Sequence, residues 1–141
     1  MSFFGVTHQR AYRKMTSTYQ QILRFLIIGG GATVLQFLLL GLFVELRLLP
    51  EVIASAVAYA LSAIFNYLAN YHLTFASRSR HRDTLPKFAV TALLGLGSNT
   101  LVFAAAFFMF GYYILAQVIA TGVTLIINFL LHKFWIYRRQ P

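Results

Sequence analysis

The sequence predicts an all-α membrane protein with four transmembrane helices, on three observations. Hydrophobic residues fill 59% of the 141 positions and charged residues only 11%, whereas soluble domains average about 25% charged residues. Four apolar runs without Asp, Glu, Lys or Arg follow one another, each close to the ~20 residues that span a bilayer. Charged residues gather between these runs. The predicted spans cover residues 25–44, 52–71, 88–110 and 114–132.

The positive charges predict how these spans are oriented. Eleven of the twelve Lys and Arg residues lie in the N-terminal segment, between the second and third spans, or at the C-terminal end. Only Arg47 lies in the turn between the first and second spans. Lys and Arg accumulate on the cytoplasmic side of membrane proteins. We therefore expect both termini and the middle loop in the cytoplasm, and we assign the net charge of +9 to membrane orientation and not to nucleic-acid binding.

The chain is expected to form one transmembrane domain, residues 24–138, after a basic lead, residues 1–23. The lead has no short apolar core that ends at a small-residue cleavage site, so we expect an interfacial or loosely ordered segment and no cleaved signal peptide. Pro86 is expected to mark the start of the third helix. The absence of Cys excludes disulfides and thiolate metal sites.

The second half of the chain repeats the first half. Arg24 aligns with Lys87, and Gln36 with Asn99, at an offset of 63 residues. After a one-residue slip, the matched pairs are Ala54 and Ala116, Ala58 and Ala120, Ser62 and Thr124, and Asn66 and Asn128. Alignment of rare polar positions separates this pattern from a chance match of two apolar hairpins. It predicts two parallel helical hairpins, related by a pseudo-two-fold axis along the membrane normal.

Polar side chains inside the spans are the candidate functional residues. One side of the second span carries Ser55, Ser62, Asn66 and Asn70, and the matching side of the fourth carries Gln117, Thr124, Asn128 and His132. Gln36 and Asn99 lie at equal depths in the first and third spans. Such groups cost several kcal/mol in hydrocarbon unless they find a partner. That partner is either a side chain of a neighbouring helix or a bound polar ligand, and the sequence leaves both open.

A basic rim adjoins these polar faces on the predicted cytoplasmic side. Arg24, Lys87 and Lys133 lie at the ends of the first, third and fourth spans. Hydrogen-bond donors beneath a ring of cations suit an anionic head group such as a phosphate. The three acids all fall in turns or loops and the four His residues are scattered. We therefore expect no catalytic centre, no metal site and no cofactor.

Small residues in the first and third spans favour close helix packing. They form Gly29-Gly30-Gly31-Ala32 and Gly95-x-Gly97-Ser98, and such residues let helix backbones approach closely in membranes. A nucleotide-phosphate loop is not indicated, because no strand precedes the glycine run and no Lys-Ser/Thr follows it.

Together these features resemble the GtrA-like family. The resemblance covers about residues 20–138. It rests on four spans, a Phe-x-x-x-Gly-Gly pattern from Phe25 to Gly30, and the paired hairpin ends at residues 66–75 and 128–137. It implies a small bacterial inner-membrane protein of cell-surface polysaccharide and lipopolysaccharide modification. Proteins of this family are thought to flip polyprenyl-phosphate-linked sugars made by a partner glycosyltransferase.

The resemblance also implies where the motif's positions fall in this chain. Its amide positions fall on Asn66, Asn70 and Asn128, and its basic exit position falls on Lys133. The first copy departs from the pattern, because His72 stands where the family commonly has Lys or Arg. This difference suggests that the second copy dominates phosphate binding.

The leading hypothesis is a non-enzymatic translocase for a polyprenyl-phosphate-linked monosaccharide, working beside a membrane-associated glycosyltransferase and plausibly as a homodimer. The expected head-group and phosphate residues are Arg24, Asn66, Asn70, Lys87, Asn128, His132 and Lys133. The expected polar path comprises Gln36, Ser62, Asn99 and Thr124. One alternative is a non-transporting membrane anchor for that glycosyltransferase. A small multidrug exporter is disfavoured, because the first span lacks the membrane-embedded Glu that such exporters share.

Overall fold

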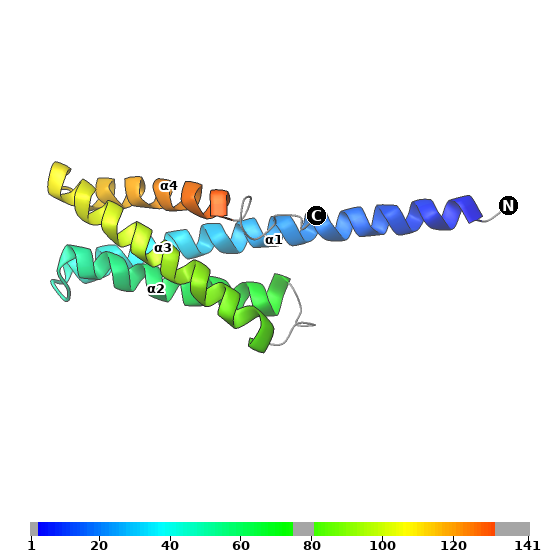
Figure 1. Ribbon diagram of the computed structural model, residues 1–141, viewed down its shortest axis with the longest axis horizontal. Coiled ribbons are helices and arrows are strands. Elements are labelled where there is room, and N and C mark those ends of the chain that lie inside the picture. The colour runs from blue at the N-terminus through cyan, green and yellow to red at the C-terminus, as the bar shows by residue number, and fades with distance from the viewer. Residues whose placement is uncertain (1–2, 75–80, 132–141) are drawn as a thin grey trace.

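The computed structural model describes residues 3–74 and 81–131, and within these ranges every regular element is a helix. The prediction of an all-α chain with four main helices is confirmed for this part of the protein (Figure 1). The elements are α1 (Phe3–Glu45), α2 (Glu51–Ala69), the short π-helix η1 (Asn70–Thr74), α3 (His81–Phe110) and α4 (Tyr113–Leu131).

Three of these helices contain segments long and apolar enough to cross a membrane: Ile22–Glu45, Glu51–His72 and Leu85–Phe110. The apolar part of α4 that the structure describes, Tyr113–Asn128, is shorter. Large apolar side chains lie exposed along all four helices, such as Leu38 and Leu101. Exposure of this kind is expected when the outer surface of a helix bundle faces lipid.

Two helix boundaries differ from expectation. α1 continues as one helix from Phe3 and so includes most of the basic lead. A helix outside the hydrocarbon layer needs no apolar face, so hydropathy could not locate its start. α3 begins at His81 and contains Pro86 in its second turn, so Pro86 does not mark the start of the helix. The proline removes one backbone donor there, close to the N-terminal end of α3.

The helices form two hairpins whose turns lie at the same end of the bundle, the turn end (Figure 1). Each turn uses one residue in the left-handed region, Arg47 with φ 54° and Gly111 with φ 66°. The Gly111 amide donates to the Phe107 carbonyl at 2.8 Å, which closes the last turn of α3. Glycine adopts this conformation without the steric cost that a Cβ brings.

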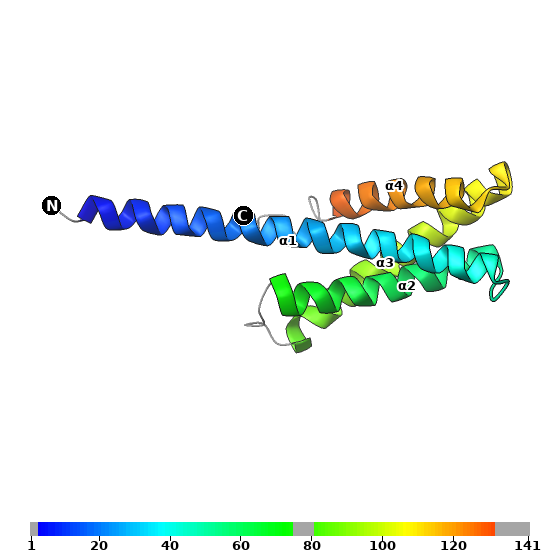
Figure 2. The same cartoon turned by 180° about the vertical axis from the view of Figure 1, so that it is seen from behind.

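The bundle places helices with matching positions in the repeat opposite each other. α1 and α3 lie on opposite faces, and α2 and α4 lie on opposite sides (Figures 1 and 2). Packing is most extensive within each hairpin, and between hairpins it is most extensive for α2 with α3. In the described ranges, α1 and α4 form no comparable contact. The pseudo-two-fold relation would make these two contacts equal, so the bundle is asymmetric.

Burial in the core follows the repeat. Leu40 and Phe103, 63 residues apart, are both fully buried. Among the residues whose burial the structure describes, the other fully buried apolar ones are the matched alanines Ala54, Ala58, Ala116 and Ala120. Alanines spaced four residues apart lie on one face of a helix and allow close approach of the neighbouring helix. These alanines belong to one buried apolar cluster with Leu40, Phe103 and Ala106.

Candidate functional site

Four polar side chains, one from each α-helix, form a hydrogen-bonded cluster in the interior of the bundle, here called the central network. Ser55 Oγ donates to Gln117 Oε1 at 2.7 Å, and Gln117 Nε2 donates to Asn99 Oδ1 at 2.8 Å. Asn99 Nδ2 donates back to Ser55 Oγ at 3.1 Å, which closes a three-membered ring. Gln36 Nε2 joins through a longer contact of 3.5 Å to Asn99 Oδ1. A ring in which every member donates and accepts is a favourable arrangement at low dielectric.

The central network joins residues that occupy matching positions in the sequence repeat. Gln36 bonds to Asn99, its own counterpart in the repeat, and Ser55 bonds to its counterpart Gln117. All four residues are at most 5% exposed. The structure therefore brings together two residues expected in the polar path, Gln36 and Asn99, and pairs their amide groups with protein side chains. Ser55 and Gln117, noted only as members of polar faces, complete the arrangement.

At the end opposite the turns, α2 passes into η1 through a pair of bonded amides. Asn70 Nδ2 donates to Asn66 Oδ1 at 2.6 Å and to the Asn66 carbonyl at 3.0 Å. Asn70 is 8% exposed, and η1 contacts both α2 and α1. Single π turns are frequent at functional sites because they redirect side chains within a helix. This one occurs inside the sequence motif shared by the two hairpin ends.

The polar side chains on the matching face of α4 are not paired in the way that those of α2 are. Thr124 is 3% exposed, and its Oγ1 has no hydrogen-bond partner among the residues that the structure describes. Asn128 Oδ1, one turn further along, is also buried and unpartnered there. The Tyr59 hydroxyl on α2 is a hydrogen-bonding neighbour of the Asn128 side chain. Unpaired polar atoms in a native core call for an explanation, such as an ordered water or a ligand.

Tyr59 is the residue of this region that the sequence did not single out. It packs against Gly95 of α3 so closely that a Cβ at Gly95 would collide with the Tyr59 hydroxyl. The small residues Gly95, Gly97 and Ser98 of the third span were visible in the sequence. The identity of the side chain facing it depends on the register of two helices that are distant in the chain, which the sequence does not specify.

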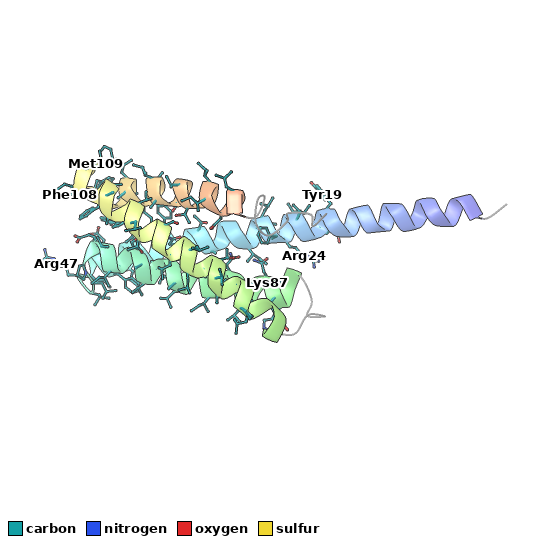
Figure 3. The ribbon with its side chains drawn as sticks, viewed as in Figure 1. Tyr19, Arg24, Arg47, Lys87, Phe108 and Met109 are labelled. Atoms are coloured by element: carbon teal, nitrogen blue, oxygen red, sulfur yellow. The ribbon has the colours of Figure 1, made fainter. Side chains whose placement is uncertain are left out.

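The basic side chains that the structure describes divide between the two ends of the bundle. Arg24 and Lys87 lie towards the end opposite the turns, here called the basic end, and Arg47 lies at the turn end (Figure 3). At the turn end, the Tyr113 hydroxyl donates to Glu45 Oε1 at 2.6 Å and so ties the second hairpin to the first. The predicted site residues His132 and Lys133 lie outside the described residues.

An all-helical bundle with long apolar helices and a polar interior defines a polytopic membrane protein. Residues 24–137 match the family described as the GtrA/DPMS transmembrane domain. The match covers most of the chain, so the protein belongs to this family, and the resemblance seen in the sequence is confirmed. Membership associates the chain with membrane handling of polyprenyl-phosphate sugars.

Proposed function

We propose that this protein translocates a polyprenyl-phosphate-linked monosaccharide across the bacterial inner membrane, for modification of cell-surface polysaccharide or lipopolysaccharide. The observation that carries the proposal is the polar interior face that leads from the basic end to the central network. Along it lie the buried polar residues Asn70, Ser62 and Thr124, whereas large apolar side chains are exposed on the outside of the bundle. A polar head group moving through a bilayer needs such a surface, whereas its polyprenyl tail can remain in lipid.

In this proposal the basic end faces the cytoplasm and receives the phosphate. Arg24 and Lys87 are exposed at that end, and Lys133, which lies outside the described residues, is the third cation expected in the phosphate site. The amides of Asn66, Asn70 and Asn128 lie next along the path, and His132, outside the described residues, is expected to act with them. Cations with nearby amide donors are suited to phosphate oxygens, because charge-assisted hydrogen bonds are about twice as strong as neutral ones. No bond is made or broken, so the proposed activity is transport without catalysis.

In this proposal, the central network blocks the path until a sugar head group displaces its hydrogen bonds. Its ring links α2, α3 and α4 at one level. A sugar that passes this level must replace these hydrogen bonds with bonds to its own hydroxyls. Such an exchange keeps every polar group paired during passage, which lowers the barrier relative to bare hydrocarbon.

A flipping assay in sealed liposomes tests the proposal. Purified protein is reconstituted with a fluorescent polyprenyl-phosphate hexose, and the fraction of probe that an external reagent reaches is followed over time. We expect flipping with wild-type protein, and about a tenfold slower rate for Lys87→Ala, because a charged hydrogen bond to phosphate is lost. Arg47→Ala, at the opposite end, is the matched control and should match the wild type. Equal rates with and without the protein would refute translocation.

The length of α1 favours a second candidate, a membrane anchor for a glycosyltransferase. α1 has 43 residues and reaches about 65 Å at 1.5 Å per residue, roughly twice the hydrocarbon thickness. Its N-terminal half projects beyond the bundle (Figures 1 and 2). As an anchor alone, the protein would tolerate Ala at Asn66 and Asn128 and would lose enzyme capture when residues 3–19 are removed. Reduced flipping in the two Asn variants, with capture intact, favours transport.

A further inference from the structure

The two halves of the repeat satisfy their polar groups unequally. In α2, the Ser62 hydroxyl donates to the Tyr59 carbonyl at 2.9 Å. Asn66 Oδ1 accepts a hydrogen bond from the side-chain amide of Asn70 at 2.6 Å. Their counterparts on α4 are Thr124 and Asn128, whose oxygens Oγ1 and Oδ1 are buried without a partner in the described part of the chain. In the first half, these polar side chains are therefore paired within the protein. In the second half, two polar oxygens have no partner among the described residues and can accept a hydrogen bond from a ligand.

These two atoms lie on one face of α4 at a spacing that suits a small ring. Residues four apart in a helix share a face and are separated by about 6 Å along the axis. A hydroxyl and an amide oxygen at that separation can bond to hydroxyls on two edges of one sugar ring. The remaining unpartnered buried atom in the described residues, Thr100 Oγ1, lies on α3 at the level of the central network and is not part of this face.

Tyr59 of α2 lies beside this polar face of α4. Its hydroxyl neighbours Asn128, and its ring is held against Gly95, which has no side chain to displace it. Its counterpart in the repeat is Thr121, whose hydroxyl already accepts a bond from Gln117 at 3.1 Å. An aromatic ring with a polar tip offers both an apolar surface and a hydrogen-bonding group. The repeat supplies this combination on one side only.

We propose that Thr124, Asn128 and Tyr59 form a subsite for the hydroxyls of an uncharged sugar ring, deeper in the bundle than the phosphate. The inference rests on the proposed function and adds the position of the sugar and its chemical class. Uncharged sugars are specified because the charged side chains that the structure describes lie at the two ends of the bundle, as Arg24, Lys87 and Arg47 do (Figure 3). A sugar carboxylate or ammonium at this depth would have no counter-ion.

Equilibrium binding to purified full-length protein in nanodiscs tests the subsite. The probes are a polyprenyl phosphate without sugar, the same lipid carrying glucose, and the same lipid carrying glucuronate. Wild-type protein should bind the glucose-bearing lipid more tightly than the bare lipid. Thr124→Val, which keeps the side-chain shape, should lose about tenfold of this preference, as expected for one hydrogen bond. Its affinity for the bare lipid should not change.

Two further variants separate binding from folding. Thr124→Ser keeps the hydroxyl and should keep the preference for the glucose-bearing lipid. Thr33→Val is the matched control, because the Thr33 hydroxyl donates to the carbonyl of Gly29 in its own helix at 3.0 Å. The Tm of Thr124→Val should equal or exceed that of the wild type, since the variant removes an unpaired buried hydroxyl. A purely structural hydroxyl would lower Tm and leave the lipid preference unchanged.

The outcomes distinguish the subsite from the proposed function. If wild-type protein binds none of the three lipids, polyprenyl-phosphate handling by this chain is refuted, and the subsite with it. If the wild type prefers the glucose-bearing lipid and Thr124→Val does so equally, only the subsite is overturned. An equal loss of preference in Thr33→Val would also overturn it. Binding of the glucuronate-bearing lipid as tightly as the glucose-bearing lipid would contradict the assignment to uncharged sugars.

Discussion

At the scale of single residues, Asn99 is the side chain on which hydrogen bonds from the other three α-helices meet. Its Oδ1 accepts from Gln36 and Gln117, and its Nδ2 donates to Ser55. A polar side chain that is fully buried in a membrane bundle and bonded in this way holds helices in one register. Gln36 contributes only the longest of these contacts, at 3.5 Å.

We expect Asn99 and its counterpart in the repeat, Gln36, to contribute unequally to the free energy of unfolding. Asn99→Leu removes three hydrogen bonds and should lower the free energy of unfolding by about 2 kcal/mol, at roughly 0.6 kcal/mol for each bond. Gln36→Leu removes one long bond and should cost about 0.5 kcal/mol. Denaturation of both variants in the same detergent measures the difference. Equal losses would show that the contacts of Asn99 do not dominate the central network.

At the scale of elements, the contact of α2 with α3 depends on the fit of Tyr59 against Gly95. Within the described residues, the two hairpins pack most extensively through this pair of helices. A residue without a side chain is needed here, because a Cβ at Gly95 would meet the Tyr59 hydroxyl. Gly97, two residues further along α3, would meet nothing within 4 Å if it carried a Cβ.

This difference predicts opposite outcomes for two similar substitutions. Gly95→Ala should destabilise the bundle by about 1–3 kcal/mol through overpacking, and Tyr59→Phe should restore part of the loss by removing the hydroxyl. Gly97→Ala should be neutral or slightly stabilising, because alanine has the higher helix propensity. Thermal denaturation of the wild type, Gly95→Ala, Tyr59→Phe and their double variant forms a double-mutant cycle, and Gly97→Ala is the control. Failure of Tyr59→Phe to relieve Gly95→Ala would place the clash elsewhere.

At the scale of the whole molecule, the sequence predicted the class, the helices and the matched depths of polar residues. Spans follow from hydropathy, and the repeat places Gln36 level with Asn99. The sequence could not predict that Gln36 and Asn99 are hydrogen-bonded in one network with Ser55 and Gln117. Such bonds depend on how each helix is rotated about its own axis in the bundle. The π turn at residues 70–74 was also not predicted, because it is a local shift in backbone hydrogen bonding without a clear side-chain signature.

The arrangement of charges predicts how the whole molecule sits in the membrane. The basic end carries Arg24 and Lys87, whereas the turn end carries Arg47 alone among the described cations (Figure 3). The positive-inside rule then places the basic end in the cytoplasm. Because the chain contains no Cys, single cysteines can report this orientation without background labelling. Two exposed positions are suitable, Gln20 ahead of the first span and Leu48 in the first turn.

We expect Leu48→Cys to react with a membrane-impermeant maleimide added outside intact inner-membrane spheroplasts. Gln20→Cys should react only after the membrane is permeabilised. The reverse pattern would place the turns in the cytoplasm and would remove the cytoplasmic phosphate site from the proposed function. Labelling of each variant at both faces would show dual insertion, which the bias of positive charge opposes. Reaction of both variants after detergent solubilisation is the control that each thiol is accessible, so that protection in intact spheroplasts reports sidedness.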